Sequence, residues 1–428
     1  IGISYQMHGL VAVDRDGIPV MPSIIWCDSR AVETGNAAFK SLGEDFCLEH
    51  YLNSPGNLTA SKLKWVKDNR PEVYARIHKI MLPGDYIAFR MTGEMKTTVS
   101  GLSEGILWDA KNETISHDLL KHYGISETLL CSTVPQFGEQ GFVTPQAADS
   151  LGISANIPVA YRAGDQPNNA FSLNVLNPGE LATTAGTSGV VYGINAQPHF
   201  DAQSRVNSFV HVNHTAAQPR NGVLLCVNGT GILNSWLRKL AGGLSYDAMN
   251  QQAAETPIGA DGLTFLPFGN GAERVLSNRL VGAHLQGLKL NNHGSGEVFR
   301  AAQEGIVCAL EYGLRVMRQM GVQTQTVRAG RANLFLSPLF REAFANVTGA
   351  NIELYDTDGA QGAARAAGIG AAIYDFKSAF NGLTRLTVIE PEAHLQAQYG
   401  EVYERWETYL GQSLLNHTNL KTIVNANK

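Results

Sequence analysis

The sequence predicts an α/β protein of more than one domain, and three observations support this fold class. The chain has 428 residues, and at roughly 100–200 residues per domain this length predicts two to four domains. Short apolar segments typical of buried strands alternate with segments of helical periodicity along the chain. Glycine contributes 44 residues, about 10% against a usual level of about 7%, which predicts many tight turns and close backbone contacts.

Charge and cysteine content narrow the class of protein. Lys and Arg number 33 against 38 Asp and Glu, for a net charge of −5, and the absence of a basic excess argues against a dedicated binder of nucleic acid or anionic membrane. Five scattered cysteines without metal spacing favour a reducing compartment. Neither a run of about 18 apolar residues nor a signal peptide is visible. We therefore expect a cytoplasmic protein with no membrane and no nucleic-acid partner.

The first part of the chain alternates strand and helix signals. Residues 1–5 predict a buried strand, and Asp14-Arg15-Asp16-Gly17 predicts the turn of a hairpin between residues 10–13 and 24–26. The pattern is helical from about residue 31 to 76. A short buried strand is predicted at 157–160, just before Ala163-Gly164-Asp165.

The pattern of strand and helix signals changes after Asn177-Pro178-Gly179. The later elements are predicted as strands at 181–184, 190–192, 223–227 and 326–328, and as helices at 232–241, 298–320 and 391–415. The last helix carries an aromatic stripe that predicts a face docked onto the body: Tyr399, Tyr403, Trp406 and Leu410. We predict a first domain at 1–177, a second at 178–390 and a C-terminal helical tail at 391–428.

Gly164-Asp165-Gln166 is the most informative segment. An aspartate directly after an apolar strand lies where α/β proteins bind ligands, at the carboxyl end of a strand. A carboxylate there can accept a proton from a substrate hydroxyl, as in phosphoryl transfer. The alternative is an Asx turn that caps the next helix.

Three further segments carry weaker signals. Gly186-Thr187-Ser188-Gly189 lies between two strands, where backbone N–H groups and hydroxyls could converge on phosphate, or where it could be an ordinary hairpin turn. The small residues of 359–368 predict a helix in close contact with a neighbouring helix or a bound base, and plain packing is the commoner case. Ala329-Gly330-Arg331-Ala332-Asn333 follows a predicted strand, and its glycine would let a planar ligand approach.

Polar side chains also gather around the first hairpin. His8, Asp28 and Arg30 offer imidazole, carboxylate and guanidinium groups at strand ends, a set suited to binding a polyol. No His, Cys or carboxylate cluster has metal-ligand spacing, so the sequence predicts no protein metal centre.

Eight motifs in order over nearly the whole chain resemble those of the FGGY family of carbohydrate kinases, and most closely its members that act on D-xylulose. They are Gln6-Met7-His8-Gly9, Trp26-Cys27-Asp28-Ser29-Arg30, Thr59-Ala60-Ser61-Lys62-Leu63-Lys64-Trp65-Val66, Leu82-Pro83-Gly84-Asp85-Tyr86 with Met91-Thr92-Gly93-Glu94, Gly164-Asp165-Gln166, Gly186-Thr187-Ser188-Gly189, Phe265-Leu266-Pro267 with Glu273-Arg274, and Asp358-Gly359-Ala360-Gln361-Gly362-Ala363-Ala364.

The resemblance implies an α/β fold of two domains, the actin-like (ribonuclease H-like) ATPase fold with an interdomain cleft. It also implies ATP-dependent phosphorylation of a keto-pentose, with ATP and Mg²⁺ as cofactors and D-xylulose 5-phosphate as the expected product. Asp165 would be the catalytic base, with Met7, His8, Asp165 and Gln166 on the sugar. The family's phosphate loop implies Gly186, Thr187 and Ser188 at the terminal phosphates, and Gly330, Arg331 and Asn333 would face the adenosine.

Two departures from the family pattern leave alternatives open. Family members carry a D-x-G-T/S segment ahead of the hairpin, whereas this sequence opens just before Gln6; we therefore expect an incomplete first domain, and the activity of this chain by itself stays open. Arg331 places a long cation where the family has glycine. A glycerol or other polyol kinase, or a non-catalytic sugar-binding protein, are the alternative functions, with a homodimer left open as the assembly.

Overall fold

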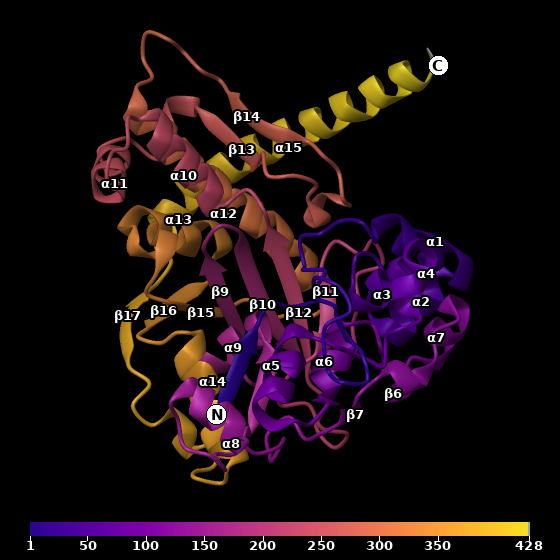
Figure 1. Ribbon diagram of the computed structural model, residues 1–428. Coiled ribbons are helices and arrows are strands. Elements are labelled where there is room, and N and C mark those ends of the chain that lie inside the picture. Colours follow the sequence, from indigo (N-terminus) through magenta and orange to yellow (C-terminus); the bar gives the residue numbers. More distant parts are fainter. Residues whose placement is uncertain (427–428) are drawn as a thin grey trace. The chain divides into compact units, whose positions relative to one another are not determined.

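The computed structural model describes residues 1–426, and the backbone alone for 417–426 (Figure 1). The chain divides into two compact units. Unit 1 comprises 1–178, 194–223 and 357–383, and unit 2 comprises 179–193, 224–356 and 384–428. Unit 1 therefore recruits two later stretches of the chain, and each unit is described by itself below.

A pair of parallel strands lies at the centre of unit 1. Strand β1 (Gly2–Tyr5) pairs with β8 (Tyr161–Gly164), with Tyr5 opposite Gly164. Helices α9 (Asp165–Ser172) and α14 (Gly359–Gly370) pack against this pair, and Figure 1 shows α14 beside β1. A Cβ on Gly2 would lie 2.0 Å from the Ala363 carbonyl oxygen, so this contact requires glycine.

The strand predicted at 157–160 lies four residues later than expected. Residues 161–164 form the ladder with β1, whereas the N–H groups of Val159 and Ala160 donate to the carbonyls of Gly141 and Ile1 outside any named strand. The apolar run therefore begins as irregular extended backbone, and its hydrophobicity alone does not distinguish the two parts.

The predicted hairpin turn is confirmed. Antiparallel bridges join Leu10 to Ile24 and Val13 to Pro19, and the Asp14 carboxylate accepts N–H bonds from Asp16 and Ile18. Strand β2 (Val11–Val13) also pairs with β3 (Lys79–Met81). The remaining elements of unit 1 are α1 (Val32–Leu42), α2 (Glu44–Tyr51), α3 (Thr59–Asn69), α4 (Pro71–Tyr74), α5 (Pro83–Thr92), β4 (Lys96–Thr97), α6 (Val99–Glu104), β5 (Trp108–Asp109), β6 (Thr114–Ile115), α7 (His117–Tyr123), β7 (Ser132–Thr133), α8 (Pro145–Leu151) and β11 (Asn207–Val210), with 3₁₀ turns η1 (Glu127–Leu129) and η5 (Ser378–Phe380).

A mixed sheet forms the centre of unit 2. Its strands run in the order β12-β10-β9-β15-β16-β17. Strand β15 pairs in parallel with both β9 and β16, whereas β10 pairs antiparallel to β9 and β17 pairs antiparallel to β16. The bounds are β9 (Leu181–Ala185), β10 (Gly189–Asn195), β12 (Asn221–Val227), β15 (Thr326–Gly330), β16 (Asn351–Tyr355) and β17 (Arg385–Ile389).

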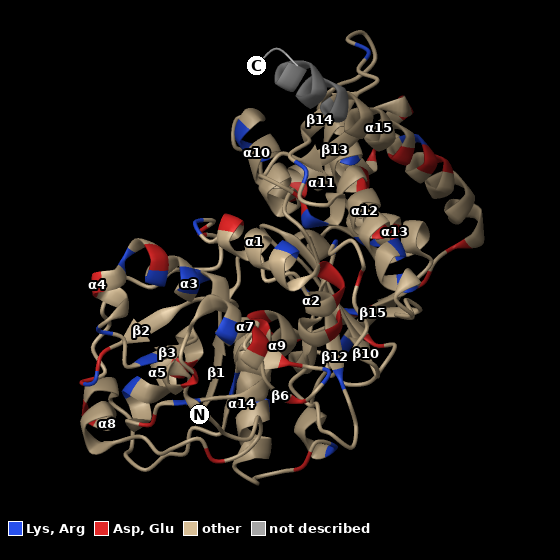
Figure 2. Ribbon diagram, turned by 90° about the vertical axis from the view of Figure 1, so that its right-hand side faces the viewer, with Lys and Arg blue, Asp and Glu red and all other residues tan. Residues whose placement is uncertain are grey.

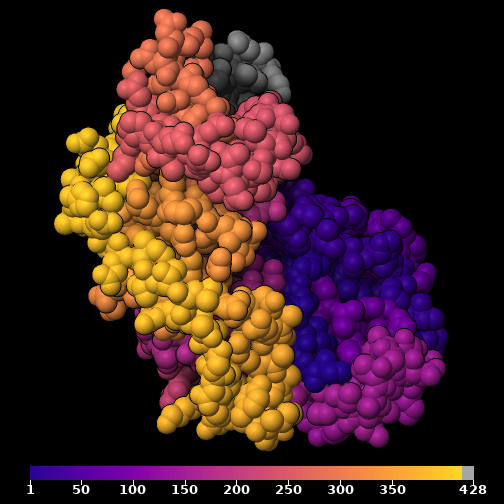
Figure 3. Space-filling view, turned by 90° about the vertical axis from the view of Figure 1, so that its left-hand side faces the viewer, coloured from indigo at the N-terminus to yellow at the C-terminus, as the bar shows by residue number. Residues whose placement is uncertain are grey.

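Helices cover this sheet, and the long helix α12 (Ser295–Gln319) is buried along most of its length. The others are α10 (Gly231–Leu240), α11 (Tyr246–Ala254), α13 (Pro338–Thr348) and α15 (Ala393–Ala426), with the hairpin β13 (Thr264–Phe268) and β14 (Gly282–Gln286) and 3₁₀ turns η2 (Ala260–Gly262), η3 (Arg274–Leu276) and η4 (Asn333–Leu336). The predicted docking face of the tail is confirmed: Trp406 is fully buried and its indole N–H donates to the Phe265 carbonyl at 3.0 Å. Figure 3 shows this yellow segment against orange residues of α13.

Charge is mixed along both units. Figure 2 shows acidic and basic residues interspersed along the helices, as the small net charge predicts. Among the described residues, no helix combines the length and apolarity that a membrane span needs. The five cysteines are free thiols.

Candidate active site

Four of the predicted residues follow the ends of two neighbouring strands in unit 1. Met7 and His8 follow the carboxyl end of β1, and Asp165 and Gln166 follow the carboxyl end of β8. Since β1 and β8 are parallel and in register, with Tyr5 opposite Gly164, the two segments leave the same edge together. The carboxyl edge of parallel strands is where α/β proteins bind ligands.

Gly164 allows the Met7 and Glu104 side chains to pack directly against the end of β8. A Cβ at Gly164 would lie 2.5 Å from Cγ of Met7 and 2.5 Å from Oε2 of Glu104. Any side chain there would push the Met7 side chain or the Glu104 carboxyl away from the start of α9. The glycine before Asp165 is therefore required by packing, in addition to any turn that it makes.

His8 is held in a specific conformation and tautomer. Its φ is +62°, which is uncommon for a residue other than glycine. The Nδ1–H donates to the backbone carbonyl of Glu104 at 2.8 Å, and the ring lies 5.2 Å from that of Phe209 between centroids. Because a carbonyl only accepts, Nδ1 carries the proton, so neutral His8 has its lone pair on Nε2.

Lys62 of α3 fastens the hairpin to the rest of unit 1. The side chain is fully buried, and Nζ donates to the carbonyls of His8 at 2.7 Å and Ile25 at 3.0 Å. Burial lowers the pKa of Lys62 to about 8. The lysine of the T-A-S-K-L-K-W motif thus positions the His8 loop through its backbone.

Asp165 begins α9, and its environment suits a carboxylate that can exchange a proton. Burial raises its pKa above the usual value, and hydrogen bonds from the backbone and side chain of Gln166 oppose that rise. Gln166 Nε2 donates to Oδ2 at 3.2 Å. The helix N-terminus favours the ionised form. A carboxylate with a raised pKa is a better proton acceptor than an exposed one.

A buried ion pair between Arg162 and Asp85 holds β8 against α5. Arg162 is fully buried, and its guanidinium donates to Asp85 Oδ1 at 3.2 Å, the Lys96 carbonyl at 3.0 Å and Gln140 Oε1 at 2.9 Å. Asp85, the aspartate of the L-P-G-D-Y motif, therefore anchors β8 to α5. Asp165 directly follows this strand.

Asp28 and Arg30 bind each other. The guanidinium makes two bonds to the carboxylate, at 2.9 and 2.6 Å, and stacks over the Trp65 ring at 4.9 Å from its centroid. The Asn57 side chain donates to the Asp28 carbonyl at 2.6 Å. The W-x-D-x-R segment and the end of α3 are thus one local arrangement.

In unit 2 the predicted phosphate loop lies against the N-terminus of a helix. Gly186-Thr187-Ser188 connects β9 to β10, and the N–H groups of Gly231 and Ile232 donate to the carbonyls of Gly186 and Thr187. A Cβ on Gly231 would lie 2.2 Å from the Gly186 carbonyl oxygen. The close approach therefore depends on glycine.

A cavity of about 520 Å³ opens beside this loop. Its lining includes Gly186, Thr187 and Asn333 of the six predicted nucleotide residues, and Ser188, Gly330 and Arg331 do not line it. Residues that the sequence did not single out complete the wall: Gly231, Ile232, Asn234, Ser235, Tyr246, Asp247, Asn250, Leu334, Leu336 and Ser337. Arg331 is exposed, with its backbone N–H bound to the Tyr355 carbonyl at 3.1 Å.

Glu273 holds the turn that enters α10. It is fully buried, and both carboxylate oxygens accept the Asn228 N–H, at 3.1 and 3.0 Å. Burial raises the pKa of Glu273 to about 7, opposed by these backbone hydrogen bonds. Through this turn the carboxylate sets where Gly231 meets the loop.

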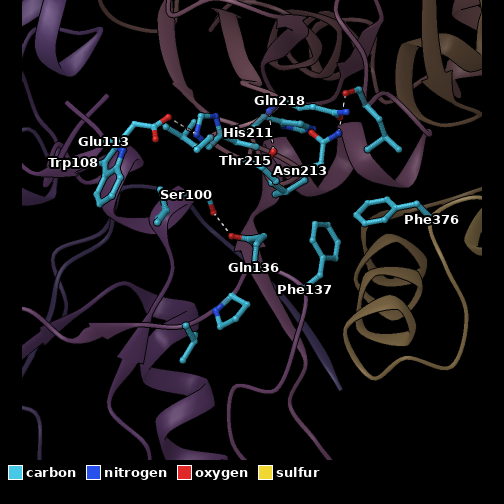
Figure 4. Close-up of a pocket in the computed structure, with 18 of the residues that line it drawn as sticks. Ser100, Trp108, Glu113, Gln136, Phe137, His211, Asn213, Thr215, Gln218 and Phe376 are labelled. Carbon is cyan, nitrogen blue, oxygen red and sulfur yellow. Dashed lines mark hydrogen bonds and ion pairs between the residues drawn. The ribbon is translucent and has the colours of Figure 1, made fainter. Parts of the chain in front are cut away.

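Unit 1 also has a larger cavity, of about 800 Å³ (Figure 4). Ser100 Oγ donates to Gln136 at 2.7 Å in its wall, and Phe137 and Phe376 face one another across one side. None of the predicted site residues lines it. The motif residues therefore indicate a site at the strand ends, away from this cavity.

No group of three or more His, Cys, Asp or Glu within residues 1–426 is arranged to hold a metal ion. Mg²⁺ in nucleotide sites is bound by one or two carboxylates together with the phosphates of the substrate.

Comparison with known proteins identifies the family. Residues 1–172 match the N-terminal domain of the FGGY family of carbohydrate kinases, and residues 181–371 match its C-terminal domain. The chain belongs to the FGGY family of carbohydrate kinases. It is an ATP-dependent sugar kinase with the two-domain α/β fold of that family.

Relatives of this FGGY kinase are named for xylulose. It is 30% identical to the xylulose kinase of Haemophilus influenzae over 96% of this chain and 84% of that protein, and 29% identical to that of Escherichia coli over 97% and 85%. A xylulose kinase structure from Brucella ovis matches with a TM-score of 0.87 at 25% identity, over 97% of this chain and 85% of that one. A Plasmodium falciparum glycerol kinase shares the fold, with a TM-score of 0.85 at 19% identity over 97% and 83%.

Sequence reasoning did not single out several residues that lie next to the predicted site residues. Lys62 lies inside a motif that the sequence displays. Its contact with the His8 carbonyl cannot be seen in the sequence. Phe209 comes from a stretch that rejoins unit 1 from far along the chain. Glu104 stands in Ser103-Glu104-Gly105, which carries no motif at all.

Proposed function

We propose that this kinase transfers the γ-phosphate of ATP to a keto-pentose, with D-xylulose as the substrate and D-xylulose 5-phosphate as the product. The observation that carries the proposal is the register of β1 and β8, which brings Met7 and His8 together with Asp165 and Gln166. The names of the relatives support the choice of sugar.

In this proposal Asp165 accepts the proton of the attacking hydroxyl. The hydroxyl oxygen forms a bond to the γ-phosphorus while the bond from that phosphorus to the β,γ-bridging oxygen breaks, and ADP leaves. Gln166 orients the Asp165 carboxylate through its 3.2 Å hydrogen bond. Met7 supplies an apolar wall, and His8 offers one ring nitrogen to a sugar hydroxyl. Positioning and charge stabilisation supply most of the catalysis in such reactions.

The nucleotide is assigned to unit 2. Gly186, Thr187 and Ser188 would hold the terminal phosphates, and Gly330, Arg331 and Asn333 would lie toward the adenosine. Mg²⁺ would arrive with ATP and neutralise charge on its phosphates. The cavity beside Gly186 and the contact between Gly231 and Gly186 support this assignment.

A coupled assay of ADP release tests the proposal. We expect turnover with D-xylulose to exceed that with other pentuloses, glycerol and other polyols. A preference for glycerol would show that the substrate is a polyol and not a ketose. Calorimetric binding of D-xylulose without turnover would show that the protein binds sugar without phosphorylating it.

A further inference from the structure

Glu104, the last residue of α6, lies under the predicted sugar site. It is 2% exposed, and its backbone carbonyl accepts the His8 Nδ1–H at 2.8 Å. Its Oε2 occupies space that a Cβ on Gly164 would need, beside the Met7 side chain. Glu104 therefore contacts the segment after β1 and the last residue of β8, which directly precedes Asp165 and Gln166.

The carboxyl of Glu104 is buried beside the Tyr5 hydroxyl. The Tyr5 side chain and the His8 backbone both act on this carboxyl as hydrogen-bond partners, although Oε1 and the Tyr5 hydroxyl lack an ideally aligned bond among the described residues. In its neutral form the carboxyl can donate one hydrogen bond as well as accept others.

The charges around Glu104 disfavour its ionised form. Asp165 of α9 and Asp85 of α5 both act on it as negative charges, and the Tyr5 hydroxyl of β1 lies close by. Burial first, and then these two carboxylates, raise the pKa of Glu104 well above its usual value.

Among the side chains that the structure describes, no Lys, Arg or His forms a salt bridge with Glu104. Arg162 of β8 is bound to Asp85, Asp109 of β5 is bound to His50 at 2.9 Å, and β11 contributes no titratable side chain. Two neighbouring carboxyls without a shared cation cannot both ionise easily, so one of them retains a proton.

We propose that Glu104 is a positioning residue that acts in its neutral carboxylic-acid form, leaving Asp165 as the carboxylate that takes the substrate proton. This inference rests on the proposed role of Asp165. The neutral acid adds a hydrogen-bond donor beneath the His8 loop without adding negative charge where a phosphate must approach. Loss of its proton at alkaline pH would place a second carboxylate beside Asp165 and oppose that approach.

The test compares Glu104→Gln with Glu104→Leu in the 428-residue chain. Gln keeps the shape and cannot ionise, so we expect kcat/KM for D-xylulose within about threefold of wild type at neutral pH, and an alkaline limb that shifts to higher pH or disappears. Leu removes both oxygens, and we expect a loss of about tenfold or more. An alkaline limb unchanged in Glu104→Gln would overturn the proposal.

Glu304→Gln is the matched control, since Glu304 is also buried and has one unpaired oxygen, but it is paired with Arg300 in unit 2. We expect it to change the melting temperature and leave the pH profile intact. An identical shift in both variants would count against a specific role of Glu104.

Two readouts separate this inference from the proposed function. Calorimetric binding of D-xylulose across pH needs no phosphoryl transfer; a wild type that binds no sugar refutes the proposed substrate. The melting temperature across pH reports the Glu104 proton itself. Because the folded protein holds that proton, stability should fall with rising pH less steeply in Glu104→Gln than in wild type. Parallel melting profiles would overturn the inference whatever the substrate.

Discussion

The two predicted half-sites are built by different means. In unit 1 the sugar side rests on buried ionisable groups: Lys62 holds the His8 loop, Arg162 and Asp85 hold β8, and Glu104 lies against Met7 and Gly164. In unit 2 the phosphate side rests on backbone contacts, where Gly231 meets Gly186 within a distance that excludes a Cβ.

The difference indicates how each half-site should fail. Buried charges hold neighbours through strong hydrogen bonds, and removing one partner leaves the other unsatisfied. Backbone contacts have no side chain to lose, but a single added methyl group separates them. Charge substitutions should therefore affect the sugar side, and added volume should affect the nucleotide side.

Asp165→Asn should have the largest effect. Removing a general base costs about 10²- to 10⁴-fold in rate, so we expect kcat to fall by about that factor. Sugar binding should change little, because the amide keeps the size and most contacts. Steady-state kinetics and calorimetry measure the two effects separately. Asp149→Asn, on the exposed face of α8, should leave both unchanged. Near-normal turnover of Asp165→Asn would remove Asp165 from the role of base.

Gly231→Ala tests the backbone contact of the nucleotide side. The new methyl group meets the Gly186 carbonyl, so the start of α10 must move. We expect KM for ATP to rise by about tenfold, with a loss of about 1–3 kcal/mol in the free energy of unfolding, as for overpacking.

Gly411→Ala is the control for that substitution. Gly411 lies in α15 with no atom near its Cβ position, and alanine there should raise stability by up to about 1 kcal/mol, from helix propensity. If Gly231→Ala bound ATP like wild type, the contact would have no role in nucleotide binding.

Lys62→Met tests the anchor of the sugar loop. The carbonyls of His8 and Ile25 would lose their donor in a buried place, at a cost of about 1–3 kcal/mol. We expect a higher KM for D-xylulose with KM for ATP unchanged. Lys64→Met is the control: Lys64 pairs with Asp68 one turn away, and such exposed pairs contribute at most about 0.5 kcal/mol. Equal effects of the two substitutions would contradict the anchoring role.

Glu273→Gln should have the smallest effect and a characteristic pH dependence. The pKa of Glu273 in the folded protein, about 7, exceeds the reference value of 4.5, so the folded state binds this proton more tightly than the unfolded chain. Wild-type stability should therefore fall as pH rises from about 4.5 to about 7, by roughly 1–3 kcal/mol. Glu273→Gln should lack this fall. Melting temperatures at several pH values measure it, and superimposable wild-type and variant profiles would refute it.

The relation between sequence and structure differs between the two kinds of contact. The positions of Asp165 after β8 and of Gly186-Thr187-Ser188 between β9 and β10 follow from apolar runs and glycines that the sequence displays. The helix at 359–370 was expected from its small residues, and its close contact with β1 and α9 agrees with plain packing. The strand lies at 161–164 and not at the predicted 157–160, because hydrophobicity does not show which residues pair with a neighbouring strand.

The order of the motifs along the chain was enough to indicate the family, the fold and the phosphoryl-transfer chemistry, because each motif is local and reads directly from neighbouring residues. Only the tertiary structure placed Lys62 beneath His8, Phe209 against its ring, and Glu104 beside Met7 and Gly164. These contacts join residues between 54 and 201 positions apart. The pKa values of Lys62, Glu104 and Glu273 also depend on burial, and burial is set by which distant segments pack together.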